Sequence, residues 1–227
     1  QDEHPEFLAM NEKGERVRSV NTAGPGQICP THPEGRKAIL GQLRSFIVED
    51  RKKAAEKGIP APLVYAIESN DNTLICQCPE CRKLIEREGA NSGADLSLAN
   101  FLADGIKDEF PDVYVDIFAY ATTLHPPKKM HARDNVVIRF AMIDDHSSRP
   151  LDGIIGNRSA DRPDFFRPLA HPVNSLPCEM LMLWSSRAKN VYIWDYWRQY
   201  FDDKVSPYII LDTIKADLEF YQDLGIE

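Results

Sequence analysis

The sequence lacks the features that mark several large classes of protein. No apolar run reaches the ~18 residues of a membrane-spanning helix. No basic stripe suited to nucleic acid is present, and the formal net charge is -8 with a pI of about 5.3. We therefore expect no membrane span and no nucleic-acid partner. An acidic chain of this kind suits neutral or cationic small molecules, or a neutral polysaccharide.

Three common functional motifs are also missing. The sequence contains no G-x-G-x-x-G, no G-x-x-x-x-G-K-[S/T] and no H-E-x-x-H pattern. Nucleotide binding and zincin-type proteolysis depend on those patterns, so both functions lack support. The 5 cysteines are an odd number and are not spaced like a secreted disulfide framework.

Four apolar, strand-like segments alternate with helical segments along the 227 residues. They lie at 63–67, 113–120, 136–143 and 191–193, and polar or acidic side chains follow each of them. This alternation is typical of a parallel α/β sheet or barrel, whose chemistry lies at the carboxyl ends of the strands. We predict a (β/α)8 TIM-barrel type of fold, incomplete here because its first strands are missing, with an open sheet as the alternative. We expect residues 1–227 to be a single domain or fragment excised from a longer protein.

Local signals also predict helix boundaries. Thr31 and Glu34 form a capping-box pattern at the start of a helix that should end near Gly58. A shorter helix is predicted over 80–88, where Gly89 stops it.

Acidic residues recur where the predicted strands end. Hydrolysis of a glycosidic bond needs two carboxyl groups, one acting as acid and the other as base or nucleophile. The candidate catalytic residues are Asp71, Asp144, Asp145 and Asp195. Each of them alone could instead cap a helix or a turn, as aspartate often does. Their recurrence at strand ends favours a functional role for at least one.

Aromatic and polar side chains near the same strand ends are candidate substrate contacts. They are Glu68, Tyr120, His146, Trp194 and Trp197. Aromatic faces suit stacking on the apolar face of a sugar ring, although ordinary core packing is the alternative for the tryptophans.

Side-chain alternation predicts a buried ion pair. Asp116 shares a strand face with Tyr120, and Arg139 shares a strand face with Asp145. A charged residue in the middle of a parallel strand is costly unless it is paired. We therefore predict that Asp116 and Arg139 pair inside the barrel, where Tyr120 and Asp145 also point.

Cysteines crowd into one short stretch. Cys76, Cys78 and Cys81 lie within six residues, directly before and within a predicted helix start. Three thiolates in this arrangement are candidate ligands for a structural zinc ion, with a fourth ligand from Cys29, a histidine or water. Buried free thiols and a redox pair are the alternatives. No other cofactor is required by the sequence.

A string of motifs carries a resemblance over nearly the whole chain. These motifs are His4-Pro-Glu-Phe7, Cys29-Pro-Thr-His-Pro-Glu34, Ser69-Asn-Asp71, Cys76-x-Cys-x-x-Cys81, Phe110-Pro-Asp-Val113, Ala119-Tyr120, Asn135-Val-Val-Ile-Arg139 and Ile193-Trp-Asp-Tyr196. The chain resembles a bacterial family of domains of unknown function, placed among glycoside-hydrolase-like (β/α)8 barrels near the α-glucuronidases and β-hexosaminidases.

The resemblance implies a barrel whose first strands lie upstream of Gln1, within a longer, exported, multidomain protein. It implies carbohydrate as the ligand class and a periplasmic, cell-surface or secreted location. Matching positions at strand ends are Asp71, Tyr120 and Asp195. The chain departs from the family after Ile143, where relatives often carry a cysteine-containing segment and His-Pro, and this chain has Asp144-Asp145-His146-Ser-Ser-Arg-Pro150.

These observations lead to one expected function and two alternatives. We expect a glycoside hydrolase that acts on an oligosaccharide or polysaccharide by carboxylate acid/base chemistry. The first alternative is a non-catalytic carbohydrate-binding barrel, and the second is a zinc-stabilised interaction module. Other domains of the parent chain are expected partners in each case.

Overall fold

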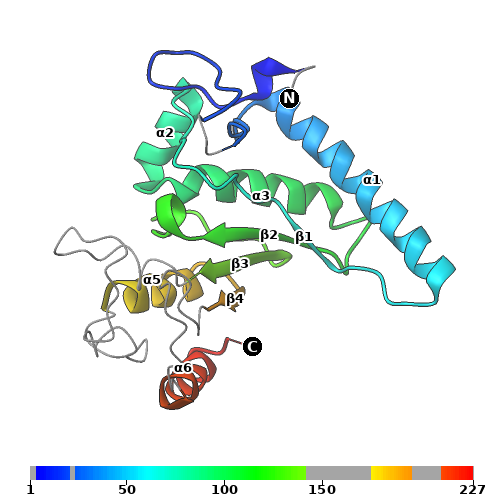
Figure 1. Ribbon diagram of the computed structural model, residues 1–227, viewed down its shortest axis with the longest axis vertical. Coiled ribbons are helices and arrows are strands. Elements are labelled where there is room, and N and C mark those ends of the chain that lie inside the picture. The colour runs from blue at the N-terminus through cyan, green and yellow to red at the C-terminus, as the bar shows by residue number, and fades with distance from the viewer. Residues whose placement is uncertain (1–3, 21–23, 142–174, 196–210, 227) are drawn as a thin grey trace, which may run out of the picture.

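The computed structural model describes residues 4–20, 24–141, 175–195 and 211–226 (Figure 1). Its elements, in chain order, are η1 (Pro5–Phe7), α1 (Pro33–Lys57), β1 (Val64–Ala66), α2 (Pro79–Glu88), α3 (Ser92–Ile106), β2 (Tyr114–Ala119), η3 (Ala121–Thr123), β3 (Val136–Ala141), α5 (Ser175–Ser185), β4 (Asn190–Trp194) and α6 (Leu211–Asp223). None of the helices in these ranges is long and apolar enough to cross a membrane.

The strands form a parallel sheet with the order β1-β2-β3-β4, which confirms the predicted α/β class. Sequence order equals spatial order, as expected when each strand returns to the sheet beside its predecessor. The register places Phe118 of β2 beside Arg139 of β3, and Arg139 beside Tyr192 of β4. Partners in a parallel sheet point to the same side, so these three side chains share one face.

One face of the sheet carries the hydrophobic core. Its apolar side chains come from alternate strand positions, among them Ile117, Ile138 and Val191. They join buried side chains of α1, α3, α5 and α6 in a single cluster. Figure 1 shows α3 lying along β2, and α1 packs against α3. Trp184 of α5 is fully buried in this cluster and donates a hydrogen bond to the Leu124 carbonyl at 2.8 Å.

The other face has a different character, and we call it the second face. We define it by Asp116, Phe118, Arg139, Tyr192 and Trp194, which alternate with the core residues. None of these side chains belongs to the helix-covered core cluster of the described residues. Tyr192 and Trp194 are both 44% exposed. The sheet therefore separates an apolar, helix-covered side from a charged and aromatic side.

The N-terminal segment, residues 4–20 and 24–32, is a loop-rich unit held by isolated antiparallel bridges. One bridge joins Leu8 to Ile28, and another joins Met10 to Arg16. The predicted capping box at Thr31 is wrong, because α1 begins at Pro33 and His32 is its N-cap, with a ring nitrogen that accepts from the Gly35 amide. The predicted helix stops are confirmed: Gly58 and Gly89 follow α1 and α2 in the left-handed conformation that glycine tolerates best.

Glu88 anchors the connection between β2 and β3, and its substitution tests this role. Its carboxylate is buried and accepts hydrogen bonds from the Lys129 and Met130 amides, both at 2.9 Å. Glu88→Ala leaves both amides without that acceptor, so we expect the free energy of unfolding to fall by about 2–4 kcal/mol in urea denaturation. The exposed Glu86 on the same helix is the control, and Glu86→Ala should change it by less than about 0.5 kcal/mol. Equal effects of the two substitutions would contradict this anchoring role.

Candidate functional site

Arg139 is the centre of the second face. Its guanidinium carbon lies 5.1 Å from the centre of the Phe118 ring and 5.7 Å from that of the Trp194 ring. The two rings meet edge to face with 5.5 Å between their centres. Both distances from the guanidinium to a ring are within the range of cation–π attraction, which fixes the long and flexible Arg139 side chain in one orientation. The aromatic residues thus hold the charge of Arg139 at the carboxyl half of the sheet.

Asp116 pairs with Arg139, as the strand alternation predicts. Asp116 is only 1% exposed, and the guanidinium also reaches Glu68, 3.5 Å away, whose side chain is 40% exposed. In the described part of the chain, neither carboxylate oxygen of Asp116 has a hydrogen-bond partner beyond this ion pair. Two carboxylates therefore share one guanidinium, one of them buried and the other accessible.

Burial governs the ionisation of Asp116. Removal from water, with a smaller contribution from the Glu68 carboxylate, raises the pKa of its carboxyl group to about 6. This value already includes the opposing effect of the Arg139 guanidinium, which lowers the pKa. Because this pKa lies above the ordinary value of 3.8, the folded protein retains the proton of Asp116 over a pH range in which the unfolded chain has lost it.

The structure brings together two of the predicted strand-end residues. The Tyr120 hydroxyl donates a hydrogen bond to the Asp71 carboxylate at 3.2 Å, which joins the ends of β1 and β2. Trp194 ends β4 and lies on the second face with its ring against Arg139. Asp195 does not join these residues. Its carboxylate accepts from the hydroxyl of Tyr221 on α6 at 2.9 Å, and Tyr221 is part of the helix-covered core. The predicted Asp144, Asp145, His146 and Trp197 lie outside the described residues.

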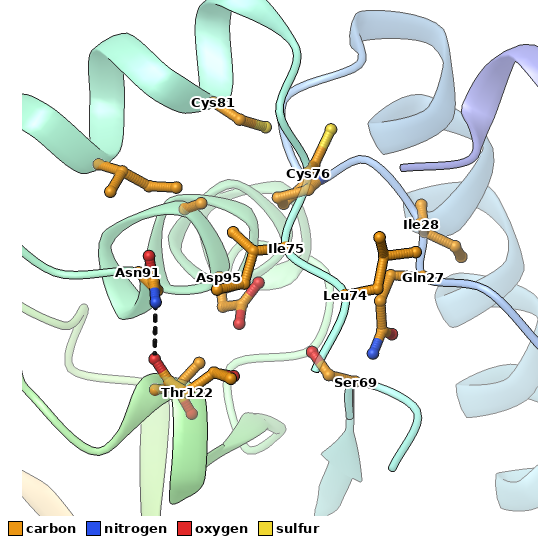
Figure 2. A pocket seen from close by; sticks show the side chains of 14 residues that line it. Gln27, Ile28, Ser69, Leu74, Ile75, Cys76, Cys81, Asn91, Asp95 and Thr122 are labelled. Atoms are coloured by element: carbon orange, nitrogen blue, oxygen red, sulfur yellow. Dashed lines mark hydrogen bonds between the residues drawn. The ribbon is translucent and has the colours of Figure 1, made fainter. Parts of the chain in front are cut away.

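A small cavity lies beside the carboxyl ends of β1 and β2. It has a volume of about 40 Å³, which is room for about two or three water molecules. Figure 2 shows Asp95, from the first turn of α3, between Thr122 and Ser69. Burial raises the pKa of the Asp95 carboxyl group to about 6, and a hydrogen bond with Ser69 opposes that rise. Sequence reasoning missed Asp95 because it lies in a helix, away from any strand end.

Four cysteines form a buried cluster on the far side of this cavity. The sulfur of Cys29 lies 3.6 Å from that of Cys78 and 3.8 Å from that of Cys81. The four sulfur atoms, including that of Cys76, are all within 4.8 Å of one another and could hold a metal ion. The three cysteines predicted from their spacing are thus brought together, and Cys29 is the fourth among the alternatives that the sequence left open.

The start of α2 arranges two of these thiols. Cys78 is the N-cap residue, and its sulfur accepts from the Cys81 amide at 3.5 Å. Cys76 is held by the Met10 amide, which donates to its sulfur at 3.3 Å. Contacts with Cys76 and Cys81 lower the pKa of the Cys29 thiol, whereas the contact with Cys29 and burial raise that of Cys81. The Thr31 hydroxyl lies 3.1 Å from the Cys81 sulfur. Thr31, which the sequence predicts as a helix cap, therefore contacts the cysteine cluster instead.

The fold and these sites define an α/β protein with a parallel sheet, a charged and aromatic second face, and a cysteine cluster beside the strand ends. The chain belongs to the DUF4838 family, described as a domain of unknown function, whose family model matches residues 1–227. Comparison with curated proteins and with solved structures finds no match.

The ionisation of Asp116 gives a testable pH dependence. Its raised pKa means that ionisation destabilises the folded state as the pH rises from the unfolded value toward about 6. Asp116→Asn cannot ionise, so its free energy of unfolding should rise relative to that of the parent by up to about 3 kcal/mol between about pH 4 and pH 7. Denaturation curves at several pH values measure this difference.

Asp112 provides a control of opposite sign. A hydrogen bond from Arg51 lowers the pKa of its carboxyl group, so its contribution to stability is present at neutral pH and lost as the pH falls. Asp112→Asn should therefore lose stability relative to the parent as the pH rises. A pH-independent difference for Asp116→Asn would contradict the raised pKa.

Proposed function

We propose that this chain is the glycoside-hydrolase-like part of a (β/α) barrel and acts on an oligosaccharide or polysaccharide. The single observation that carries the proposal is the second face, where Trp194, Phe118 and Arg139 lie beside Glu68. Aromatic rings stack on the apolar faces of sugars, and fixed charged groups bind their hydroxyls. The family resemblance points to the same class of ligand.

The one-sided packing of the helices supports a barrel over an open sheet. A doubly wound open sheet has helices on both faces, so both of its faces are apolar. A barrel has helices outside only, and its inner face carries polar side chains toward the carboxyl ends of the strands. Helices α1, α3, α5 and α6 join the core on one face, while Asp116 and Arg139 occupy the other.

The proposed chemistry uses carboxylates at the strand ends. We assign Asp71 as the general acid or base, with Asp144 or Asp145 as its partner. Asp71 is exposed, and the hydrogen bond from Tyr120 orients its carboxylate. Tyr120 and Glu68 are assigned as substrate contacts, and His146 and Trp197 are assigned the same role from the sequence. Asp195 is left out of this set, because its carboxylate accepts from Tyr221 of the helix-covered core. Asp116 holds Arg139 in place instead of reacting, since it is buried.

A zinc-stabilised interaction module is the second candidate, and the cysteine cluster favours it. The two functions are compatible, because a structural metal can stabilise a domain that also binds sugar. A periplasmic, cell-surface or secreted setting follows from the resemblance and suits an enzyme of polysaccharides.

The test combines hydrolysis and binding on a panel of oligosaccharides. Asp71→Asn should abolish turnover and leave affinity within about threefold, since it removes an acid but little contact surface. Trp194→Ala should weaken binding by about tenfold through the loss of stacking. Asp134→Asn, at an exposed position before β3 and thus at the opposite end of the sheet, is the control and should change neither quantity.

Each outcome separates the candidates. Binding without turnover in the parent chain supports the non-catalytic carbohydrate-binding barrel. Turnover that survives Asp71→Asn contradicts the assigned acid or base. Absence of both binding and turnover across the panel contradicts a carbohydrate function.

A further inference from the structure

We propose that Cys29, Cys76, Cys78 and Cys81 bind a single zinc ion, and that this centre, acting with Gln27, holds the loop of residues 68–72 in position. The first half is independent of the proposed carbohydrate function. The second half rests on it, because this loop carries Glu68 and Asp71.

The sulfur separations fit one tetrahedral metal ion. Zinc–thiolate bonds of about 2.3 Å in a tetrahedron place the sulfur atoms about 3.8 Å apart. The Cys29 sulfur lies 3.6 Å and 3.8 Å from those of Cys78 and Cys81, and no pair of the four exceeds 4.8 Å. These pairs are too far apart for a disulfide, whose sulfur atoms are about 2.05 Å apart. A four-iron cluster places iron and sulfide between its thiolates and therefore requires a wider arrangement.

The surroundings of the sulfur atoms match those of a structural site. Each of the four cysteines is buried, and two backbone amides donate to sulfur, from Met10 to Cys76 and from Cys81 to Cys78. Such outer hydrogen bonds orient thiolate ligands and spread their negative charge. The start of α2 adds the positive end of a helix dipole beside Cys78 and Cys81. A closed set of four thiolates leaves no position for a reacting molecule, so the role is structural.

The local hydrophobic core is too small to join these segments by itself. Apart from the four cysteines, the buried cluster contains only Ala9 among the described residues, with Met10 and Leu74 partly buried against it. The ligands come from separate parts of the chain: Cys29 precedes α1, Cys76 follows β1, and the other two begin α2. A metal ion that cross-links them supplies stability that apolar burial cannot provide here.

Gln27 extends the centre to the strand-end loop. Its side-chain amide pairs with the backbone of Asn70 in both directions, donating to the carbonyl at 2.7 Å and accepting from the amide at 2.8 Å. The same nitrogen donates to the Asn72 side chain at 3.0 Å. In return, Asn70 donates to the Gly26 carbonyl at 2.6 Å, and Asn72 donates to the Pro25 carbonyl at 3.1 Å.

The loop is therefore fixed from two sides. Gln27 is two residues before Cys29, and Asn72 is four residues before Cys76, so the hydrogen-bonded clamp and the metal centre join the same two segments. Asp71, which lies between Asn70 and Asn72, accepts from Tyr120. Glu68, two residues before Asn70, lies beside Arg139. Loss of the metal releases both segments, and the loop then loses its defined position. Gln27 is thus a positioning residue.

Metal analysis of the purified chain tests the first half. We expect about one zinc per chain, with release by a chelator exposing four thiols to a thiol reagent in addition to Cys178. Cobalt substituted for zinc should give the intense visible bands of tetrahedral cobalt thiolate. Cys178→Ser, the matched cysteine control, should keep the metal, and Cys29→Ser should lose it or bind it at least about tenfold more weakly.

Several results would overturn this half. They are iron in place of zinc, no metal after purification without chelators, or full zinc affinity in Cys29→Ser. Cobalt spectra and thiol counts of the parent chain decide the matter even if Cys29→Ser does not fold. Protection of the thiols as disulfides in a metal-free chain would point to the alternative of a redox pair.

Hydrogen exchange and sugar binding together test the second half. In Gln27→Ala we expect zinc to remain, the amide of Asn70 to exchange faster, and oligosaccharide affinity to fall by about fivefold or more. Gln42→Ala, at an exposed position on α1, is the control and should change none of these. Unchanged exchange at Asn70 overturns the clamp whether or not sugar binds. Faster exchange in a chain whose parent binds no sugar instead contradicts the proposed function and leaves the clamp standing.

Discussion

The packing of helices against one face of the parallel sheet is the constraint on which the other features depend. Apolar residues at alternate positions, such as Ile117 and Ile138, bury that face under α1, α3, α5 and α6. The intervening positions are then turned to the other side, where a charge must find a partner because the centre of the sheet is dry. Asp116 and Arg139 neutralise each other as an ion pair, and the Phe118 and Trp194 rings pack against the guanidinium.

The sequence predicts what depends on local periodicity. Strand alternation predicts the pairing of Asp116 with Arg139, and apolar runs between helical segments predict the parallel α/β class. Contacts that close over long stretches of chain are not visible in such patterns. The sequence leaves Cys29 as one of several possible fourth members of the cysteine cluster, and it does not predict that Gln27 binds Asn70; both contacts span more than 40 residues. Local residue type also misleads where a tertiary contact wins, as when Thr31 contacts the cysteine cluster instead of capping α1.

The cysteine cluster and the second face are connected through one short loop. The same chain segment leaves β1, passes Glu68 and Asp71, and enters the cluster at Cys76. A rigid support is what a binding site on a loop requires, since small displacements of reacting groups are costly. The N-terminal segment contributes few apolar side chains to any core. In our proposal its role is to support the loop of residues 68–72 through Gln27 and Cys29.

The central claim is that the second face of the sheet binds carbohydrate, and a crystal structure of the chain grown with mixed oligosaccharides tests it most directly. We predict sugar density against Trp194 and Arg139, within hydrogen-bond distance of Glu68, and a second carboxylate ~5–10 Å from Asp71 across the sugar. Sugar density at another surface only, or no sugar density in crystals whose packing leaves the second face open, would contradict the account.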